Sequence, residues 1–134
     1  MEARREQGSY TQAPLNFARL FEAKGFTVLD PNGQKIGKVD DVYVGKDRQP
    51  RYLGVKMGLL GAKMTVIPVQ LVKQVDLNEQ TLHLTAPKDV AKSGPVFDRD
   101  HVFTPEDEVE IWNHYGLGKP VYTVTEIILW KEAS

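Results

Sequence analysis

Residues 33–75 constrain the fold most, because apolar and polar side chains alternate there between closely spaced glycines and prolines. Alternation with a period of two is typical of β-strands that bury one face. The apolar positions form three groups: Ile36, Val39, Val42 and Val44, then Tyr52, Leu53 and Val55, then Val66, Ile67 and Val69. Short strands that follow one another at this spacing indicate a small barrel or sandwich.

Turn-forming residues separate these strands. Residues 31–33 read Pro-Asn-Gly, residues 46–50 are polar, and two glycines bracket a third connection at residues 58–61. Such residues fit tight reversals of the chain. Pro68 lies inside a strand-like run and predicts an edge strand or a bulge, because proline donates no backbone hydrogen bond.

The rest of the barrel follows from the same pattern. The first strand is expected at residues 26–29, residues 70–75 continue the fifth strand, and residues 81–85 form the sixth. Residues 88–95 predict a short helical turn or loop that closes the barrel. Residues 15–21, which include two phenylalanines, fit either a short helix or an extended lead-in.

Two elements are expected after residue 97. Thr104 is a good N-cap, Pro105 fits the first helical position, and residues 106–108 place acids at the positive end of the helix dipole. Gly116 and Gly118 end this short helix. Residues 120–130 are rich in β-branched and aromatic side chains, which favours a strand.

A terminal strand this apolar must be covered. Either an edge of its own barrel or the edge of a second copy can cover it. We favour the second arrangement, a homodimer built by strand addition. The interface side chains would then be Val121, Val124, Ile127, Ile128 and Trp130.

Composition bounds the size and the chemistry of the fold. The 134 residues suffice for one domain with a modest core, and the absence of cysteine excludes disulfides and thiolate chemistry. The first ten residues lack the apolar stretch of a secretory signal, and the apolar run at residues 127–130 is too short to span a bilayer. A soluble cytoplasmic protein is therefore expected.

Charge is distributed unevenly along the chain. The formal net charge is +1 over residues 1–24, +3 over residues 25–97 and −5 over residues 98–134. Two interpretations are open: the two larger regions are solvated surfaces that happen to differ, or they dock on each other or on a neighbouring copy. The acidic C-terminal part argues against nucleic acid as the partner.

The sequence contains no recognisable catalytic, cofactor-binding or metal-binding motif. Asp40 and Asp41 are adjacent, but strand alternation sends neighbouring side chains to opposite faces. Asp41 is therefore expected to accept a hydrogen bond from the backbone or from an arginine or lysine. His83, His101 and His114 lack the spacing of a zinc site. We predict no catalytic residue, no metal and no cofactor.

The order of the motifs resembles that of one known family. Residues 36–39 (Ile-Gly-Lys-Val), 41–44 (Asp-Val-Tyr-Val) and 51–55 (Arg-Tyr-Leu-Gly-Val) are similar to successive segments of PRC-barrel domains. Residues 58–61 and 65–68 resemble the glycine-flanked loop and the apolar-apolar-proline strand of that family. The resemblance covers roughly residues 25–97. The family is named for the cytoplasmic domain of the photosynthetic reaction centre H subunit and also occurs at the end of a bacterial ribosome maturation factor.

The resemblance and the strand pattern together imply a mainly β fold. We expect a small, six-stranded, strongly bent antiparallel barrel with a short C-terminal helix and a terminal strand. Residues 1–20 would form a flexible arm and residues 21–97 the barrel. Residues 98–134 would form an extension that packs on the barrel or on a dimer mate.

Leu59 and Leu60 are the candidate partner contact. Large apolar side chains in a glycine-flanked loop often mark a contact, although they could equally fold back over an open end of the barrel. The known contexts of the family are docking to a membrane photosystem and to a ribosomal protein. The resemblance therefore implies a non-enzymatic protein-interaction or assembly module, and the alternative is an RNA- or ribosome-associated binding protein.

Overall fold

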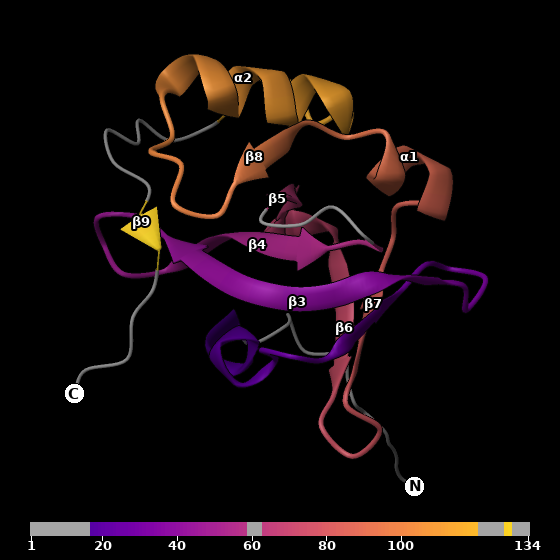
Figure 1. Cartoon of the computed structure of the whole chain (residues 1–134). Helices are drawn as coiled ribbons and strands as arrows, with labels where there is room; N and C mark the ends of the chain where they lie inside the picture. The colour runs from indigo at the N-terminus through magenta and orange to yellow at the C-terminus, as the bar shows by residue number, and fades with distance from the viewer. Residues whose placement is uncertain (1–16, 59–62, 121–127, 130–134) are drawn as a thin grey trace, which may run out of the picture.

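The computed structural model describes residues 17–58, 63–120 and 128–129, and the strands in these residues form one sheet (Figure 1). Its strands are β2 (Thr27–Leu29), β3 (Lys35–Val44), β4 (Pro50–Lys56), β5 (Lys63–Pro68), β6 (Val72–Asp76), β7 (Thr81–Leu84), β8 (Val96–Asp98) and β9 (Ile128–Leu129). The helices are the 3-10 turns η1 (Phe17–Glu22) and η2 (Val69–Leu71) and the α-helices α1 (Lys88–Lys92) and α2 (Pro105–His114). The predicted mainly β fold class is confirmed.

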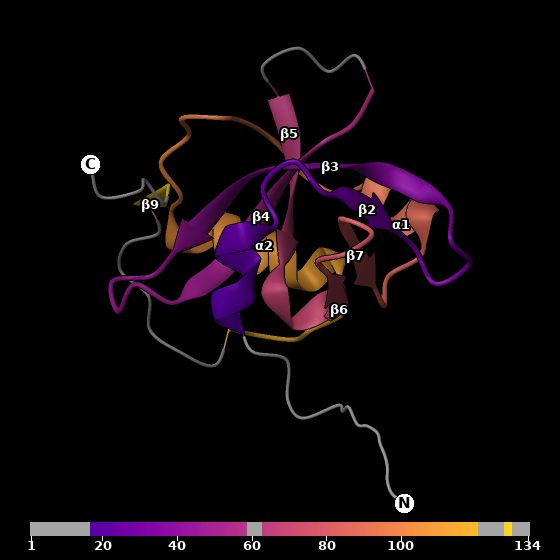
Figure 2. The ribbon, with the colours of Figure 1, turned by 90° about the horizontal axis from the view of Figure 1, so that it is seen from below.

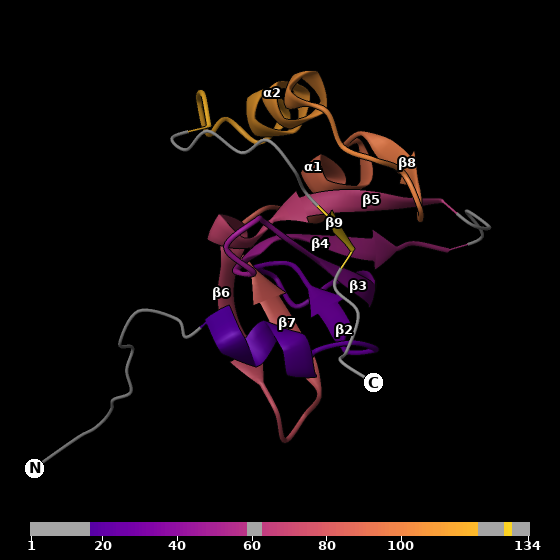
Figure 3. The same cartoon turned by 90° about the vertical axis from the view of Figure 1, so that its left-hand side faces the viewer.

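The long strand β3 is the centre of the sheet. The strand order is β6-β7-β2-β3-β4-β5-β8, and β9 pairs with the end of β3 at residues 43–44. The pairing of β3 with β4 is irregular at two places: Asp40 is an extra residue in β3 between Val39 and Asp41, and Arg51 is an extra residue in β4 opposite Tyr43 and Val44. Bulges bend a strand and increase its twist, which accounts for the strong curvature visible in Figures 2 and 3.

Three details of the sheet differ from the prediction. In the described residues it has eight strands rather than six, because β8 and β9 join it after the expected end of the barrel. Strands β2 and β7 pair in parallel, whereas apolar alternation carries no information about strand direction. The outermost strands of the order, β6 and β8, each pair with a single strand in the described part of the chain, so the sheet is not closed there.

Pro68 lies at the end of a strand that is not an edge. It opposes Tyr52 of β4, and β8 pairs with the other side of β5 at residues 63–65. Because β8 does not reach Pro68, the missing amide removes no hydrogen bond on that side. The prediction of an edge or a bulge is therefore wrong. The turn η2 follows directly, so residues 72–76 form a separate strand instead of continuing the fifth.

Two apolar clusters lie on opposite faces of β3, β4 and β5. Along β4, Tyr52 faces one cluster, whereas Leu53 and Val55 face the other. The inner cluster includes Leu20, Val28, Ile36, Val39, Leu53, Val55, Ile67 and Leu82. The outer cluster consists of Tyr43, Tyr52, Met64, Val66, Phe97, Phe103, Ile111 and Trp112.

Helices cover both faces of the sheet. Figure 3 shows α1 and α2 on one side of β4 and β5, and η1 with β7 on the other. The helical alternative for residues 15–21 is the one observed, because Leu20 of η1 is fully buried in the inner cluster. At the start of α2, the Thr104 hydroxyl accepts a hydrogen bond from the Asp107 amide at 3.1 Å. The Asp107 carboxylate accepts one from the Thr104 amide at 2.9 Å, which confirms the predicted helix start.

Candidate functional site

Asp40 and Asp41 bind cations of their own chain. Asp41 is buried, accepts a hydrogen bond from Arg99 Nε at 2.8 Å and lies 3.2 Å from Lys24 Nζ, which confirms the predicted arginine or lysine partner. The expectation that the two carboxylates point to opposite faces is wrong. The bulge after Val39 also brings Asp40 Oδ2 within 3.3 Å of Arg99 Nε. The hydrogen bond with Asp41 raises the pKa of Arg99. The contacts of Arg99 with both carboxylates join the segment after β8 to β3.

The three histidines lie apart, and each contacts a neighbour in the fold. His101 Nε2 lies 2.7 Å from Asp107 Oδ2, and His114 Nε2 lies 2.7 Å from the Val90 carbonyl oxygen. His83 Nε2 lies 3.2 Å from a threonine hydroxyl of its own strand. Among the residues that the structure describes, no three His, Cys, Asp or Glu side chains gather closely enough to hold a metal ion.

A buried carboxylate joins α2 to β4. Tyr52 O–H donates a hydrogen bond to Glu108 Oε1 at 2.7 Å, and Trp112 Nε1–H donates one to the Tyr52 oxygen at 3.0 Å. Burial raises the pKa of Glu108, and the hydrogen bond from Tyr52 and the positive charge of Arg51 oppose that rise. These bonds lie inside the outer cluster and hold α2 on the sheet.

Replacing Glu108 with glutamine is expected to stabilise the protein slightly at neutral pH. Because the folded-state pKa of Glu108 is raised, this carboxyl favours folding below its unfolded pKa and loses that contribution as the pH rises through the folded pKa. Glutamine keeps an oxygen that accepts the Tyr52 hydrogen bond, but it carries no buried charge. Urea unfolding should show a gain of about 0.5–1 kcal/mol near pH 7 and none near pH 4.

The matched control is Glu110→Gln, which removes an exposed carboxylate from the same helix. It should leave the pH dependence of the free energy of unfolding unchanged. A Glu108→Gln protein that is destabilised equally at both pH values would contradict this account of the buried carboxylate.

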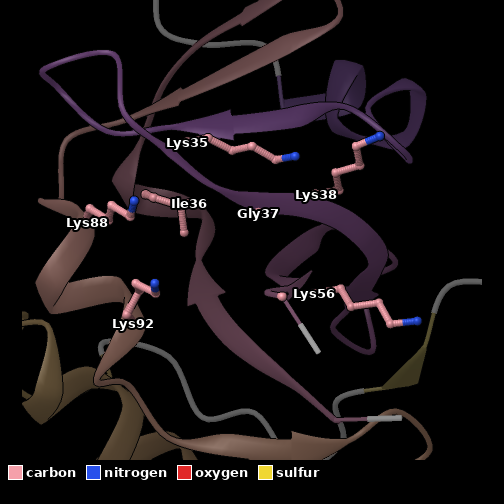
Figure 4. A pocket seen from close by; sticks show the side chains of 8 residues that line it. Lys35, Ile36, Gly37, Lys38, Lys56, Lys88 and Lys92 are labelled. Atoms are coloured by element: carbon pink, nitrogen blue, oxygen red, sulfur yellow. The ribbon is translucent and has the colours of Figure 1, made fainter. Parts of the chain in front are cut away.

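Five lysines surround an open groove between β3, the end of β4 and α1 (Figure 4). This lysine groove has a volume of about 430 Å³ and is lined by Lys35, Ile36, Gly37, Lys38, Lys56, Gly58, Lys88 and Lys92. Figure 4 shows Lys88 and Lys92 on the α1 wall, and Lys38 and Lys56 beyond Gly37 on the strand side. The side chain of Ile36 is buried, so the charged groups that the described lining offers are its five ammonium groups.

The positive charge of the lysine groove is not neutralised by the described part of the chain. None of its five ammonium groups forms an ion pair with a described residue. Residues 59–62, which follow Gly58, read Leu-Leu-Gly-Ala and carry no charge. Asp30 offsets part of the charge through its electrostatic interaction with Lys88. A groove lined by charges of one sign attracts ligands of the opposite sign.

Asp30 fixes the two walls of the groove relative to each other. Its buried carboxylate accepts hydrogen bonds from the amides of Asn32 (2.9 Å), Gln34 (2.8 Å) and Lys88 (3.2 Å). Burial opposes ionisation, but these donors and the Lys88 charge outweigh it and lower the pKa of Asp30. One carboxylate therefore orders both the turn before β3 and the first residue of α1.

The strand side of the groove brings like charges together. Lys38 and Lys56 are direct partners in the antiparallel pairing of β3 and β4, an arrangement that destabilises a sheet when both residues are charged. At the neighbouring position, a Cβ on Gly37 would lie 2.3 Å from the Lys56 carbonyl oxygen, so the close approach of the strands requires glycine. The fold thus keeps two exposed cations side by side without a described counter-ion.

The lining residues suit binding better than a reaction. Lysine ammonium groups are compact charges that bind carboxylates and phosphates. Among the described residues, the lining contains no carboxylate, histidine, hydroxyl or aromatic ring. It therefore offers anion binding without an acid–base pair and without a surface on which nucleic acid bases could stack.

Sequence reasoning missed the lysine groove. The available signals were the net charge of +3 over residues 25–97 and the spacing of Lys88 and Lys92, one helical turn apart. The other three lysines belong to two different strands. Only the folded sheet places them beside α1.

The comparison with protein-family models agrees with the fold. The model of the PRC-barrel domain matches residues 16–91, which is more than half of the chain. The chain belongs to the PRC-barrel family. The predicted resemblance is therefore confirmed. The matched region of this PRC barrel includes every lining residue of the groove except Lys92, which follows directly, whereas α2 and β9 lie beyond it. No curated protein matches the chain.

The predicted interface residues of this PRC-barrel protein stay predictions. All but one lie outside the described residues: Leu59, Leu60, Val121, Val124, Ile127 and Trp130. Ile128 belongs to β9, whose backbone pairs opposite Val44 of the same chain. In the described part of the protein, no helix has the length and apolar character needed to cross a membrane.

Proposed function

We propose that this PRC-barrel protein is a non-enzymatic interaction module that docks an acidic segment of a protein partner in the lysine groove. The observation that carries the proposal is the set of five lysines without a described ion-pair partner around one open groove. The pairing of Lys38 with Lys56 supports it, because an anionic ligand would relieve their repulsion.

One observation favours an acidic protein segment over RNA. The described lining of the groove has no aromatic side chain on which bases could stack. RNA remains the second candidate, because lysines also bind phosphates.

The predicted apolar contact fits the same surface. Leu59 and Leu60 follow Gly58, which lines the groove, directly in the sequence. A partner segment that combines acidic and apolar side chains would use both features. The predicted homodimer is a separate proposal, since strand addition would require residues 120–130 to pair with a second copy.

The first test measures binding of a labelled, glutamate-rich peptide by fluorescence anisotropy at low ionic strength. Lys38→Glu/Lys56→Glu is expected to weaken binding at least about tenfold, because it replaces two attractive charges with repulsive ones. Higher salt should weaken binding to the unmodified protein, since exposed charges are screened beyond about 8 Å at 0.15 M salt.

The matched control is Lys46→Glu/Lys73→Glu, which changes the net charge equally at two exposed lysines outside the groove. Equal loss of peptide affinity in both double variants would refute the groove as the docking surface. If an oligouridine bound more tightly than the peptide, and the groove variant abolished that binding, RNA would replace the acidic protein segment as the proposed ligand.

A further inference from the structure

The outward face of α2 is acidic and lacks a described partner. Glu106, Val109, Glu110 and Asn113 are exposed, whereas Glu108, Ile111 and Trp112 are buried against the sheet. At 100° per residue, Glu106 and Glu110 lie on the side of the helix opposite the buried face. Neither carboxylate forms an ion pair with a residue that the structure describes.

The α1 wall of the lysine groove matches this face in charge and spacing. Lys88 and Lys92 are four residues apart on α1, as Glu106 and Glu110 are on α2. Residues at this separation lie about 5–6 Å apart on one helix face. Two helices that pack side by side could therefore pair both glutamates with both lysines.

One chain does not make this contact with itself in the described residues. The C-terminal end of α2 touches α1, because His114 Nε2 lies 2.7 Å from the Val90 carbonyl oxygen. Glu106 lies eight residues earlier, about 12 Å along the helix axis from that contact. Figures 1 and 3 show α2 on the outside of the fold, and its buried residues fix the acidic face away from the sheet.

We propose that the acidic segment that docks in the lysine groove is helix α2 of a second copy of this chain. The inference rests on the proposed function of the groove and names its partner. Each copy carries both surfaces. The contact is therefore head-to-tail, unless two copies each dock α2 in the groove of the other. Because exposed ion pairs are individually weak, the association should be weak and sensitive to salt. It uses surfaces other than residues 120–130.

Sedimentation velocity of the full chain tests the proposal. Association that increases with protein concentration is expected at about 0.02 M salt and should disappear at about 0.5 M salt. Lys88→Glu/Lys92→Glu and Glu106→Lys/Glu110→Lys should each abolish association. An equimolar mixture of these two variants should restore it, because each copy then offers charges complementary to those of the other. This restoration also shows that both variants are folded.

Two further variants control for the net charges of the first two. Lys46→Glu/Lys73→Glu and Glu22→Lys/Glu79→Lys have the same net charges as those variants, but the altered residues are exposed positions outside both surfaces. Each control variant alone should still associate at low salt, because both surfaces are intact, and loss of association equal to that of its charge-matched counterpart would overturn the proposal. So would a chain that stays monomeric at low salt while the glutamate-rich peptide still binds the groove, and in that case the proposed function would stand. A chain that stays monomeric at low salt and also fails to bind the peptide would refute both this proposal and the proposed function.

Discussion

Replacing Trp112 with alanine is expected to lower the free energy of unfolding by about 3–5 kcal/mol. The side chain is buried, with 4% of its surface exposed, and belongs to the outer cluster between α2 and the sheet. Alanine would leave a cavity and would remove the Nε1–H hydrogen bond to the Tyr52 oxygen. The loss is a large share of the stability of a typical domain, about 5–15 kcal/mol. Urea unfolding followed by far-ultraviolet circular dichroism measures it.

The control is Trp112→Phe, which keeps an aromatic ring but lacks the donor. It should cost about 1–2 kcal/mol. Both proteins should unfold in one transition, because the outer cluster contains residues from β4, β5 and α2. A Trp112→Ala protein that loses less than about 1 kcal/mol would show that α2 contributes little to the stability of the barrel. Two separate unfolding transitions would show that α2 and the barrel unfold independently of each other.

Replacing Gly37 with alanine is the second change with a large expected effect, a loss of about 2–3 kcal/mol. The new Cβ would lie 2.3 Å from the Lys56 carbonyl oxygen and 3.0 Å from Val55 Cγ1. The first contact is with backbone, which cannot move aside without disturbing the pairing of β3 with β4. The strain should therefore appear as a lower midpoint of urea unfolding, and displacement of Lys38 and Lys56 should also weaken peptide binding in the groove.

Gly45→Ala is the matched control. Its Cβ would lie 3.0 Å from Arg51 Nε and 3.2 Å from Asp47 Oδ1, both of which belong to side chains that can shift. A loss below about 1 kcal/mol is expected. If the two alanine variants had equal stability, close contact at Gly37 would not be the reason for glycine in β3.

Several elements could be predicted because their causes are local. Thr104 and Pro105 mark the start of α2 through capping chemistry that needs no other part of the chain. The alternation in residues 36–44 and 52–55 gives two strands, since one face of each strand must be apolar to meet the core. The hydrogen bond to Asp41 was predictable because a buried carboxylate requires a partner.

Other features depend on contacts between distant segments. A bulge in β3 brings Asp40 and Asp41 to one arginine, and alternation alone predicted the opposite. The strand that contains Pro68 was assigned to an edge because β8, which pairs with residues 63–65 of that strand, begins 28 residues after Pro68. The parallel pairing of β2 with β7 likewise joins segments that no turn motif connects.

By itself, the sequence determined the family, most of the strand positions between residues 26 and 85, and the short acidic helix, because periodicity, turn residues and caps act over a few neighbouring residues. The tertiary structure alone decided the sheet order, the outer cluster beneath α2 and the lysine groove. The groove takes its lysines from β3, β4 and α1, and electrostatic potential depends on distances in space. Those distances exist only after the bent sheet brings the three elements together.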